Sequence, residues 1–108
     1  MQSPVFEMLT WRSAINVKDS EMIRVMTHFS EVVEKLPGFL YQSLYKNAAS
    51  QWVCIYFWST EKEAYASNEL VANTVEFAEL MALIEKESVT MEVFSAMQST
   101  GHISFVAS

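Results

Sequence analysis

The stretch QWVCIYFW, residues 51–58, decides the fold of this chain. β-branched and aromatic residues dominate it, and such residues favour β-strands. Because side chains alternate along a strand, these residues divide between two faces. One face carries Trp52, Cys54, Tyr56 and Trp58, and the other carries Val53, Ile55 and Phe57. Neither face is polar, so we expect both to be covered: one by helices, the other by a barrel interior or a second subunit.

The segments before this strand predict a hairpin and a further strand. Residues 39–46, FLYQSLYK, are strand-like, and the short polar turn NAAS at 47–50 joins them to the next strand. Neighbouring strands joined by so short a turn are antiparallel. Residues 5–13, VFEMLTWRS, carry apolar groups on both faces and predict the first strand of the chain.

A helix is predicted between the first strand and the hairpin. Asp19 or Ser20 offers an N-cap, and Pro37-Gly38 stops the helix because proline cannot continue the hydrogen-bond ladder. Between them an apolar stripe follows helical spacing: Met22, Val25, Met26, Phe29, Val32, Val33 and Leu36.

The C-terminal half predicts a second helical region and a last strand. Thr60 and Glu63 form a capping box, and a helix runs from Glu61 to about Leu70. Asn73-Thr74 kinks or restarts it, and a second apolar stripe extends the helix to about Glu87. This stripe consists of Phe77, Leu80, Met81 and Ile84. Residues 90–97, TMEVFSAM, predict the last strand, and the tail 98–108 allows a short edge strand around Ile103, Phe105 and Val106.

The order strand, helix, strand, strand, helix, strand predicts one domain over residues 1–97. It is the ferredoxin-like βαββαβ arrangement of the α+β class, with an antiparallel sheet. The helices would cover one face of the sheet and leave apolar side chains on the other. Pairing two sheets face to face in a homodimer would bury those side chains, so we expect a dimeric α+β barrel.

Composition narrows the classes of function. Apolar residues make up 51% of the 108 residues, which exceeds the need of one small core and favours a partner interface or a ligand cavity. The net charge of −6 argues against nucleic-acid binding. The single cysteine, Cys54, excludes a multi-cysteine metal site, and two glycines cannot build a phosphate-binding loop. We expect no leader, and no run of about 20 apolar residues is present in these 108 residues. We therefore expect a cytoplasmic protein with no metal, cofactor, nucleic-acid or membrane partner.

Three stretches in this order resemble a known family: PGFLYQSLYK, then WVCIYFWSTEKEAYAS, then TMEVFSAM. Over Val5 to Met97 the chain resembles the antibiotic biosynthesis monooxygenase-like family of dimeric α+β barrels. The resemblance implies cofactor-independent monooxygenation of polyphenolic aromatics, haem degradation, or no assigned reaction. The haem-degrading branch uses an Asn on the first strand, a Trp ending the third strand and a His ten residues later. Here Trp58 matches, but Asn68 stands in place of the His, and Thr10, Trp11 and Arg12 offer no Asn. Haem degradation is therefore not expected.

Five residues are candidates for a ligand pocket. Trp58 ends its strand, and Tyr65 and Asn68 lie one turn apart on the following helix, where Asn68 could orient a ligand oxygen. Trp11 and Arg12 end the first strand, and Arg12 could hold a carboxylate or phenolate. The alternative interpretation is structural: core aromatics, a polar helix residue facing solvent and a surface arginine. No catalytic residue is identified.

Two functions remain open. The first is a monooxygenase that needs no metal or flavin and acts on a small aromatic or polyphenolic compound, whose own anion reduces O₂. The second is a non-catalytic dimeric module of the same fold that binds a small molecule or serves a stress-related role.

Overall fold

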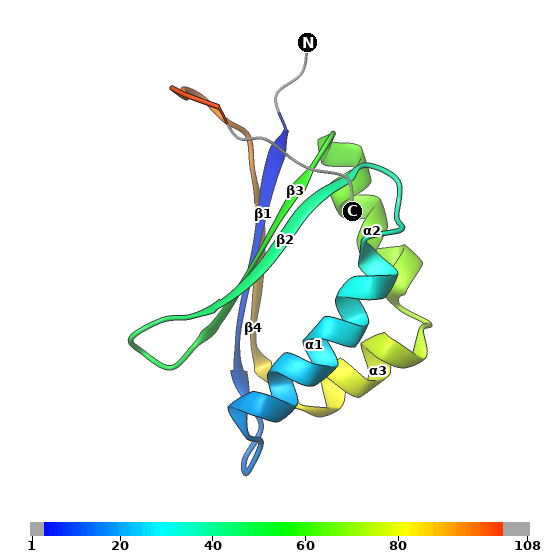
Figure 1. Ribbon diagram of the computed structural model, residues 1–108, viewed down its shortest axis with the longest axis vertical. Helices are drawn as coiled ribbons and strands as arrows, with labels where there is room; N and C mark the ends of the chain where they lie inside the picture. The colour runs from blue at the N-terminus through cyan, green and yellow to red at the C-terminus, as the bar shows by residue number, and fades with distance from the viewer. Residues whose placement is uncertain (1–3, 103–108) are drawn as a thin grey trace.

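The structure is a computed structural model, and it describes residues 4–102. In these residues the chain forms one antiparallel sheet of four strands and three helices (Figure 1). The order along the chain is β1 (Val5–Ser13), α1 (Asp19–Val33), β2 (Phe39–Lys46), β3 (Trp52–Trp58), α2 (Glu61–Val71), α3 (Val75–Ala82) and β4 (Ile84–Phe94). The strand order in the sheet is β2-β3-β1-β4. The predicted ferredoxin-like α+β fold is therefore confirmed.

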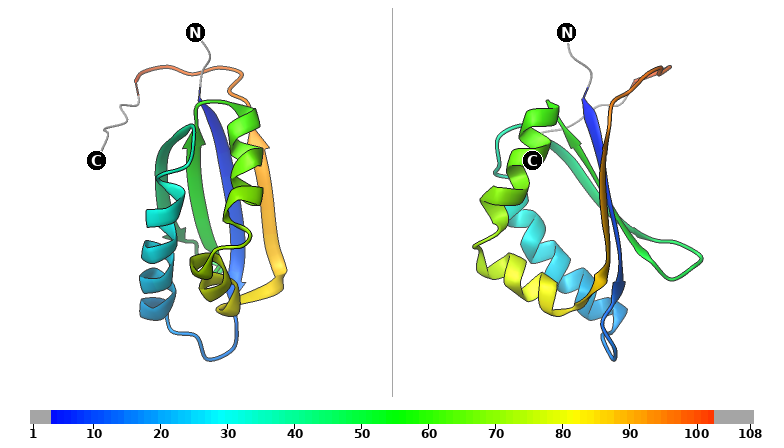
Figure 2. Two further views of the ribbon diagram at one scale, coloured as in Figure 1. Left: turned by 90° about the vertical axis from the view of Figure 1, so that its right-hand side faces the viewer. Right: turned by 180° about the vertical axis from the view of Figure 1, so that it is seen from behind.

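The sheet and the helices form two layers. Figure 2 shows all three helices on one face of the sheet, and no other element of residues 4–102 covers the opposite face. The alternation along β3 follows this division. Trp52, Cys54, Tyr56 and Trp58 are buried against the helices, whereas Val53, Ile55 and Phe57 are only half-buried on the outer face.

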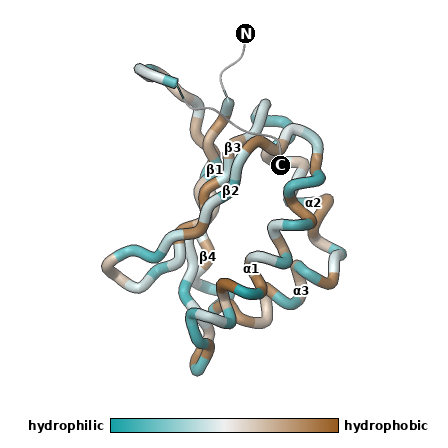
Figure 3. Tube along the Cα trace, in the orientation of Figure 1, coloured by the Kyte–Doolittle hydropathy of each residue, from teal (hydrophilic) through white to brown (hydrophobic). Residues whose placement is uncertain are grey.

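The core lies between the layers, and α1 supplies its helical side. Five residues of α1 are buried: Met22, Val25, Met26, Phe29 and Val33. They share one stripe because their spacing follows the 3.6-residue turn. Figure 3 shows hydrophobic residues along the central strands.

The outer face of the sheet carries a row of aromatic rings across all four strands. The register pairs Tyr41 with Phe57, Phe57 with Phe6, and Phe6 with Phe94. The ring centroids of these three pairs lie 6.2, 5.4 and 5.6 Å apart, which is the range of favourable ring contacts. This row, called the outer aromatic row below, leaves the outer face apolar.

The helix starts agree with the sequence in two cases of three. Thr60 Oγ1 accepts from the Glu63 backbone N–H at 3.1 Å, so the predicted capping box is present. Thr74 caps α3 by accepting from the Phe77 N–H, which confirms the restart. The N-cap of α1, however, is Lys18, with no side-chain cap bond. Asp19 lies inside the helix and pairs with Lys46 at 2.8 Å instead of capping.

Four predicted boundaries are wrong. Helix α1 ends at Val33 rather than Leu36, in a turn before Pro37. The last helix ends at Ala82 and not at Glu87, and β4 begins at Ile84 and not at Thr90, because Ile84 pairs with Ser13. Strand pairing with β1 thus outweighs the helical spacing of Ile84. Strand β4 ends at Phe94 rather than Met97, and residues 95–102 contain no strand. The suggested edge strand around Ile103, Phe105 and Val106 lies outside the described residues.

Candidate functional site

A cavity of about 290 Å³ lies between the helix-facing side of the sheet and the three helices. Its size is near the lower end of the roughly 300–1,000 Å³ that is usual for small-molecule sites. Most of its lining is apolar, and five aromatic side chains contribute: Trp11, Phe29, Tyr56, Trp58 and Phe77. The polar side chains in the lining are Glu7, Ser67, Asn68 and Lys86. A few polar groups in an aromatic enclosure are typical of a site that orients a flat ligand.

Glu7 is the most unusual residue of this lining. Strand β1 alternates, so Val5, Glu7, Leu9 and Trp11 all face the helices, and Glu7 is only 2% exposed. The indole Nε1 of Trp58 donates a hydrogen bond of 2.8 Å to Glu7 Oε1. Burial raises the pKa of Glu7 above its usual value, and the bond from Trp58 opposes this effect only in part. The Glu7 carboxyl therefore loses its proton at a higher pH than a surface glutamate does.

Cys54 and Tyr56 on β3 keep their protons. Burial raises the pKa of the Cys54 thiol to about 11, although Gln42 Nε2 donates to its Sγ at 3.5 Å. Burial also raises the pKa of Tyr56 well above its usual value. Both side chains line the cavity as neutral groups. A buried thiol whose pKa is raised in this way is a poor nucleophile.

Three of the five pocket candidates line the cavity, namely Trp11, Trp58 and Asn68. The amide Nδ2 of Asn68 lies 3.5 Å from both the Tyr65 carbonyl and the Met91 sulfur, so its interactions are long and weak. The Trp11 Nε1 is buried and has no hydrogen-bond partner within residues 4–102. A buried N–H without an acceptor is costly, and a ligand oxygen could supply one.

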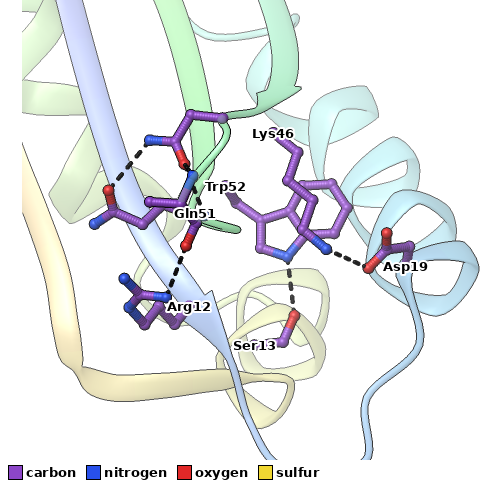
Figure 4. A network of polar contacts seen from close by, with 8 residues as sticks. Arg12, Ser13, Asp19, Lys46, Gln51 and Trp52 are labelled. Atoms are coloured by element: carbon purple, nitrogen blue, oxygen red, sulfur yellow. Dashed lines mark hydrogen bonds and ion pairs between the residues drawn. The ribbon is translucent and has the colours of Figure 1, made fainter.

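The other two candidates lie outside the cavity lining. Tyr65 is 49% exposed on α2. Arg12 follows Trp11 on β1 and points away from the helices. Its guanidinium donates to the Ala49 carbonyl at 3.0 Å, which ties it to the β2–β3 turn (Figure 4). In the same region Trp52 Nε1 donates to Ser13 Oγ at 2.9 Å, so these contacts brace the end of the sheet.

The sequence reasoning missed Glu7. One signal was available: in VFEMLTW a single acidic residue occupies the same strand face as Val5, Leu9 and Trp11. An acid at an inward position of an otherwise apolar face is unusual, because burying a carboxylate is costly.

Residues 4–102 contain neither a cluster of metal-binding side chains nor a membrane-spanning helix. Among residues 4–102 no group of three or more His, Cys, Asp or Glu side chains could hold a metal ion. None of the helices described there is long and apolar enough to cross a membrane.

The fold has well-defined relatives among solved structures. Neither the protein-family models nor the curated proteins yield a match to this sequence. Solved structures with the same ferredoxin-like α+β fold, in contrast, include SnoaB and several proteins described as proposed antibiotic biosynthesis monooxygenases.

SnoaB, a cofactor-independent oxygenase from Streptomyces nogalater, superposes with a TM-score of 0.75 at 16% identity, over 92% of this chain and 98% of that chain. A proposed antibiotic biosynthesis monooxygenase from Nitrosomonas europaea gives 0.67 at 16% identity, over 94% and 98%. Rv0793 from Mycobacterium tuberculosis gives 0.71 at 13% identity, over 92% and 100%. At these identities the likeness establishes the fold alone, and the site must be argued from its own residues.

Proposed function

We propose that this protein is a cofactor-independent monooxygenase that acts on a small hydroxylated aromatic compound. The observation that carries the proposal is the cavity of about 290 Å³ whose aromatic walls enclose one buried carboxyl group. SnoaB, which has the same fold, is described as a cofactor-independent oxygenase, and this supports the assignment.

For this oxidation the protein mainly has to bind the substrate and exclude water. An electron-rich hydroxyarene anion can pass an electron to O₂ by itself. Overall the arene loses two hydrogens and gains one oxygen atom, which gives a quinone, and the second oxygen leaves as water. The protein needs to hold the ring, favour its anion and keep the reactive intermediate away from solvent. Trp11, Tyr56 and Trp58 offer ring surfaces for this purpose, and Asn68 offers an amide.

We also propose that the protein is a homodimer built through the outer face of its sheet. The outer aromatic row and the half-buried Ile55 and Val53 lie on the side that no helix of the described chain covers. A second copy presents the same apolar surface, so a two-fold axis can bring the two faces together. Each exposed apolar side chain that becomes buried contributes about 1.5–3 kcal/mol.

The function is tested with a panel of naphthols, hydroquinones and anthrones under O₂. Quenching of tryptophan fluorescence reports binding, because Trp11 and Trp58 line the cavity. Oxygen uptake and quinone formation report turnover. We expect Val89→Trp, which fills the cavity from β4, to abolish both signals. The matched control is Val75→Trp on α3, where the native side chain is 68% exposed and outside the lining.

The outcomes separate the two functions. Turnover that Val89→Trp removes and Val75→Trp leaves intact supports the monooxygenase. Binding without turnover across the whole panel favours the non-catalytic binding module instead. Failure of every compound to bind would contradict both.

A further inference from the structure

The cavity contains one carboxylic acid, and only one of its two oxygens accepts a hydrogen bond from the described residues. Among the described lining residues Glu7 is the only carboxylate. Its Oε1 accepts from Trp58 Nε1, and no donor within residues 4–102 reaches Oε2. A buried carboxylate satisfies its oxygens where donors are present. Oε2 is therefore available for a donor that the ligand brings.

The position of Glu7 is rigid. It lies in β1, an inner strand of the sheet, and the register pairs it with Tyr56 on one side and Val93 on the other. The bond from Trp58 fixes the carboxyl itself. A group held on paired strands and by a buried donor keeps its geometry when a ligand enters.

The other titratable groups of the lining are poor proton acceptors. From β3, Cys54 and Tyr56 keep their protons because burial raises the pKa of each. From β4, Lys86 is an exposed ammonium, which donates but does not accept. The three helices contribute only side chains that do not titrate, among which Ser67 Oγ donates to the Ala64 carbonyl. Glu7 is left as the base.

We propose that Glu7 is the catalytic base of this cavity and that its Oε2 accepts the hydroxyl proton of the bound hydroxyarene. This assignment rests on the proposed function. It adds the residue that takes the proton of the substrate.

The reaction balances with O₂ as the only co-reactant. The ligand O–H bond breaks and its proton moves to Glu7, so the arene becomes an anion. The anion gives one electron to O₂, and the resulting aryloxyl radical and superoxide join through a new bond between a ring carbon and oxygen. Glu7 returns its proton to the terminal peroxide oxygen. Loss of water, with the hydrogen of that ring carbon, breaks the O–O bond and leaves the quinone.

The decisive variant is Glu7→Gln, because its amide oxygen can still accept from Trp58 while it takes no proton from the ligand. The matched control is Glu31→Gln, which removes the same charge from the exposed surface of α1. With a naphthol that the native protein oxidises, we expect Glu7→Gln to lower the rate by about 100-fold or more. The loss should shrink as the pH approaches the pKa of the naphthol itself, since the ligand then arrives as its anion. Glu31→Gln should behave as the native protein.

A second readout does not require turnover. 4-Nitrophenol absorbs visible light strongly only as its anion, so its spectrum reports the proton transfer in the complex. At a pH below the pKa of free 4-nitrophenol, where the free compound is neutral, we expect the native complex to show the anion and the Glu7→Gln complex to show the neutral phenol. An equal rate and an equal bound spectrum in the two proteins would overturn the role of Glu7 while the monooxygenase stands. A native protein that ionises bound nitrophenol but oxidises nothing would retain the role of Glu7 and contradict the monooxygenase. Failure of every probe to bind would overturn both.

Discussion

The indole N–H of Trp58 and the carboxyl of Glu7 meet inside the cavity, 2.8 Å apart. They lie on neighbouring antiparallel strands, where the register pairs Glu7 with Tyr56 and Val5 with Trp58. Glu7 and Trp58 are thus diagonal neighbours on one face, a distance that a long and an aromatic side chain can bridge. Trp58 is 1% and Glu7 2% exposed, so this hydrogen bond is shielded from water.

The first prediction concerns Trp58→Phe. This change removes the only side-chain hydrogen bond that lowers the pKa of Glu7, so that pKa should rise further. The lost bond to a charged acceptor and the smaller ring should together lower the free energy of unfolding by about 3 kcal/mol. Denaturant titration measures the stability, and carboxyl-carbon NMR across a pH series measures the pKa.

The control for this change is Trp52→Phe. Trp52 is also buried and also donates through its indole, but its acceptor is Ser13 Oγ and it does not line the cavity. Its loss should reduce stability and leave the titration of Glu7 in place. Equal Glu7 titrations in the two variants would show that the bond from Trp58 does not tune the carboxyl.

The second prediction follows from the raised pKa of Glu7 and concerns stability against pH. In the unfolded chain Glu7 ionises at its usual pKa, whereas the folded protein retains the proton to higher pH. The folded state therefore binds more protons in the interval between the two pKa values. The contribution of Glu7 to stability is greatest below the unfolded pKa and falls as the pH rises through the folded one.

Glu7→Gln has no proton to lose, so its stability relative to the native protein should increase as the pH rises through that interval. Thermal melts of both proteins over a pH series measure the difference. Glu31→Gln, on the exposed side of α1, should differ from the native protein by a nearly constant amount. A constant difference for Glu7→Gln as well would mean that the carboxyl is not perturbed by burial.

The fold could be predicted because its signals are local. The apolar alternation of β3, the hairpin turn and the Thr60–Glu63 capping box are all patterns within a few residues, and each is present in the structure. The end of α3 could not be predicted in this way. Ile84 continues the helical stripe, and only its pairing with Ser13, far earlier in the chain, starts a strand there.

The site was only partly predictable for a related reason. Trp11, Trp58 and Asn68 line the cavity, but Arg12 points away because strand alternation places it on the other face from Trp11. The position and pKa of the Glu7 carboxyl depend on its hydrogen bond from Trp58, which is far away in sequence. A single charge in a strand does not by itself indicate which distant side chain will pair with it.

The third prediction tests the homodimer. Ile55 lies at the middle of the outer face, between Met8 on β1 and Ser43 on β2. Ile55→Lys would place an ammonium in the proposed interface twice, once from each copy, and burying an unpaired charge is very unfavourable. Light scattering at micromolar concentration should show a dimer for the native protein and a monomer for this variant.

The same substitution at Ile15 provides the control. Ile15 is 89% exposed in the connection between β1 and α1, so Ile15→Lys should remain dimeric. Circular dichroism of each variant checks that the domain is still folded. A monomeric native protein, or a folded Ile55→Lys that stays dimeric, would place any interface elsewhere.

The last prediction concerns Gly38, where β2 begins beside the start of α2. Its φ of +81° is a left-handed conformation that costs other residues about 1–2 kcal/mol. A Cβ atom at this position would also collide with the Glu63 side chain, which completes the capping box with Thr60. Gly38→Ala should therefore lower the free energy of unfolding by more than the backbone term alone, as measured by denaturant titration.

Two further variants separate the cost of the left-handed backbone conformation from the cost of the collision with Glu63. Gly101 has a φ of +92°, and a Cβ there would meet nothing within 4 Å, so Gly101→Ala should cost no more than the backbone term. Glu63→Ala removes the side chain that the new methyl group of Gly38→Ala would strike, and it also weakens the capping box with Thr60. Because the collision is then absent, the double variant should lose less stability than the sum of the two single ones. Strict additivity would show that Glu63 moves aside freely and that only the conformation of the backbone requires glycine at position 38.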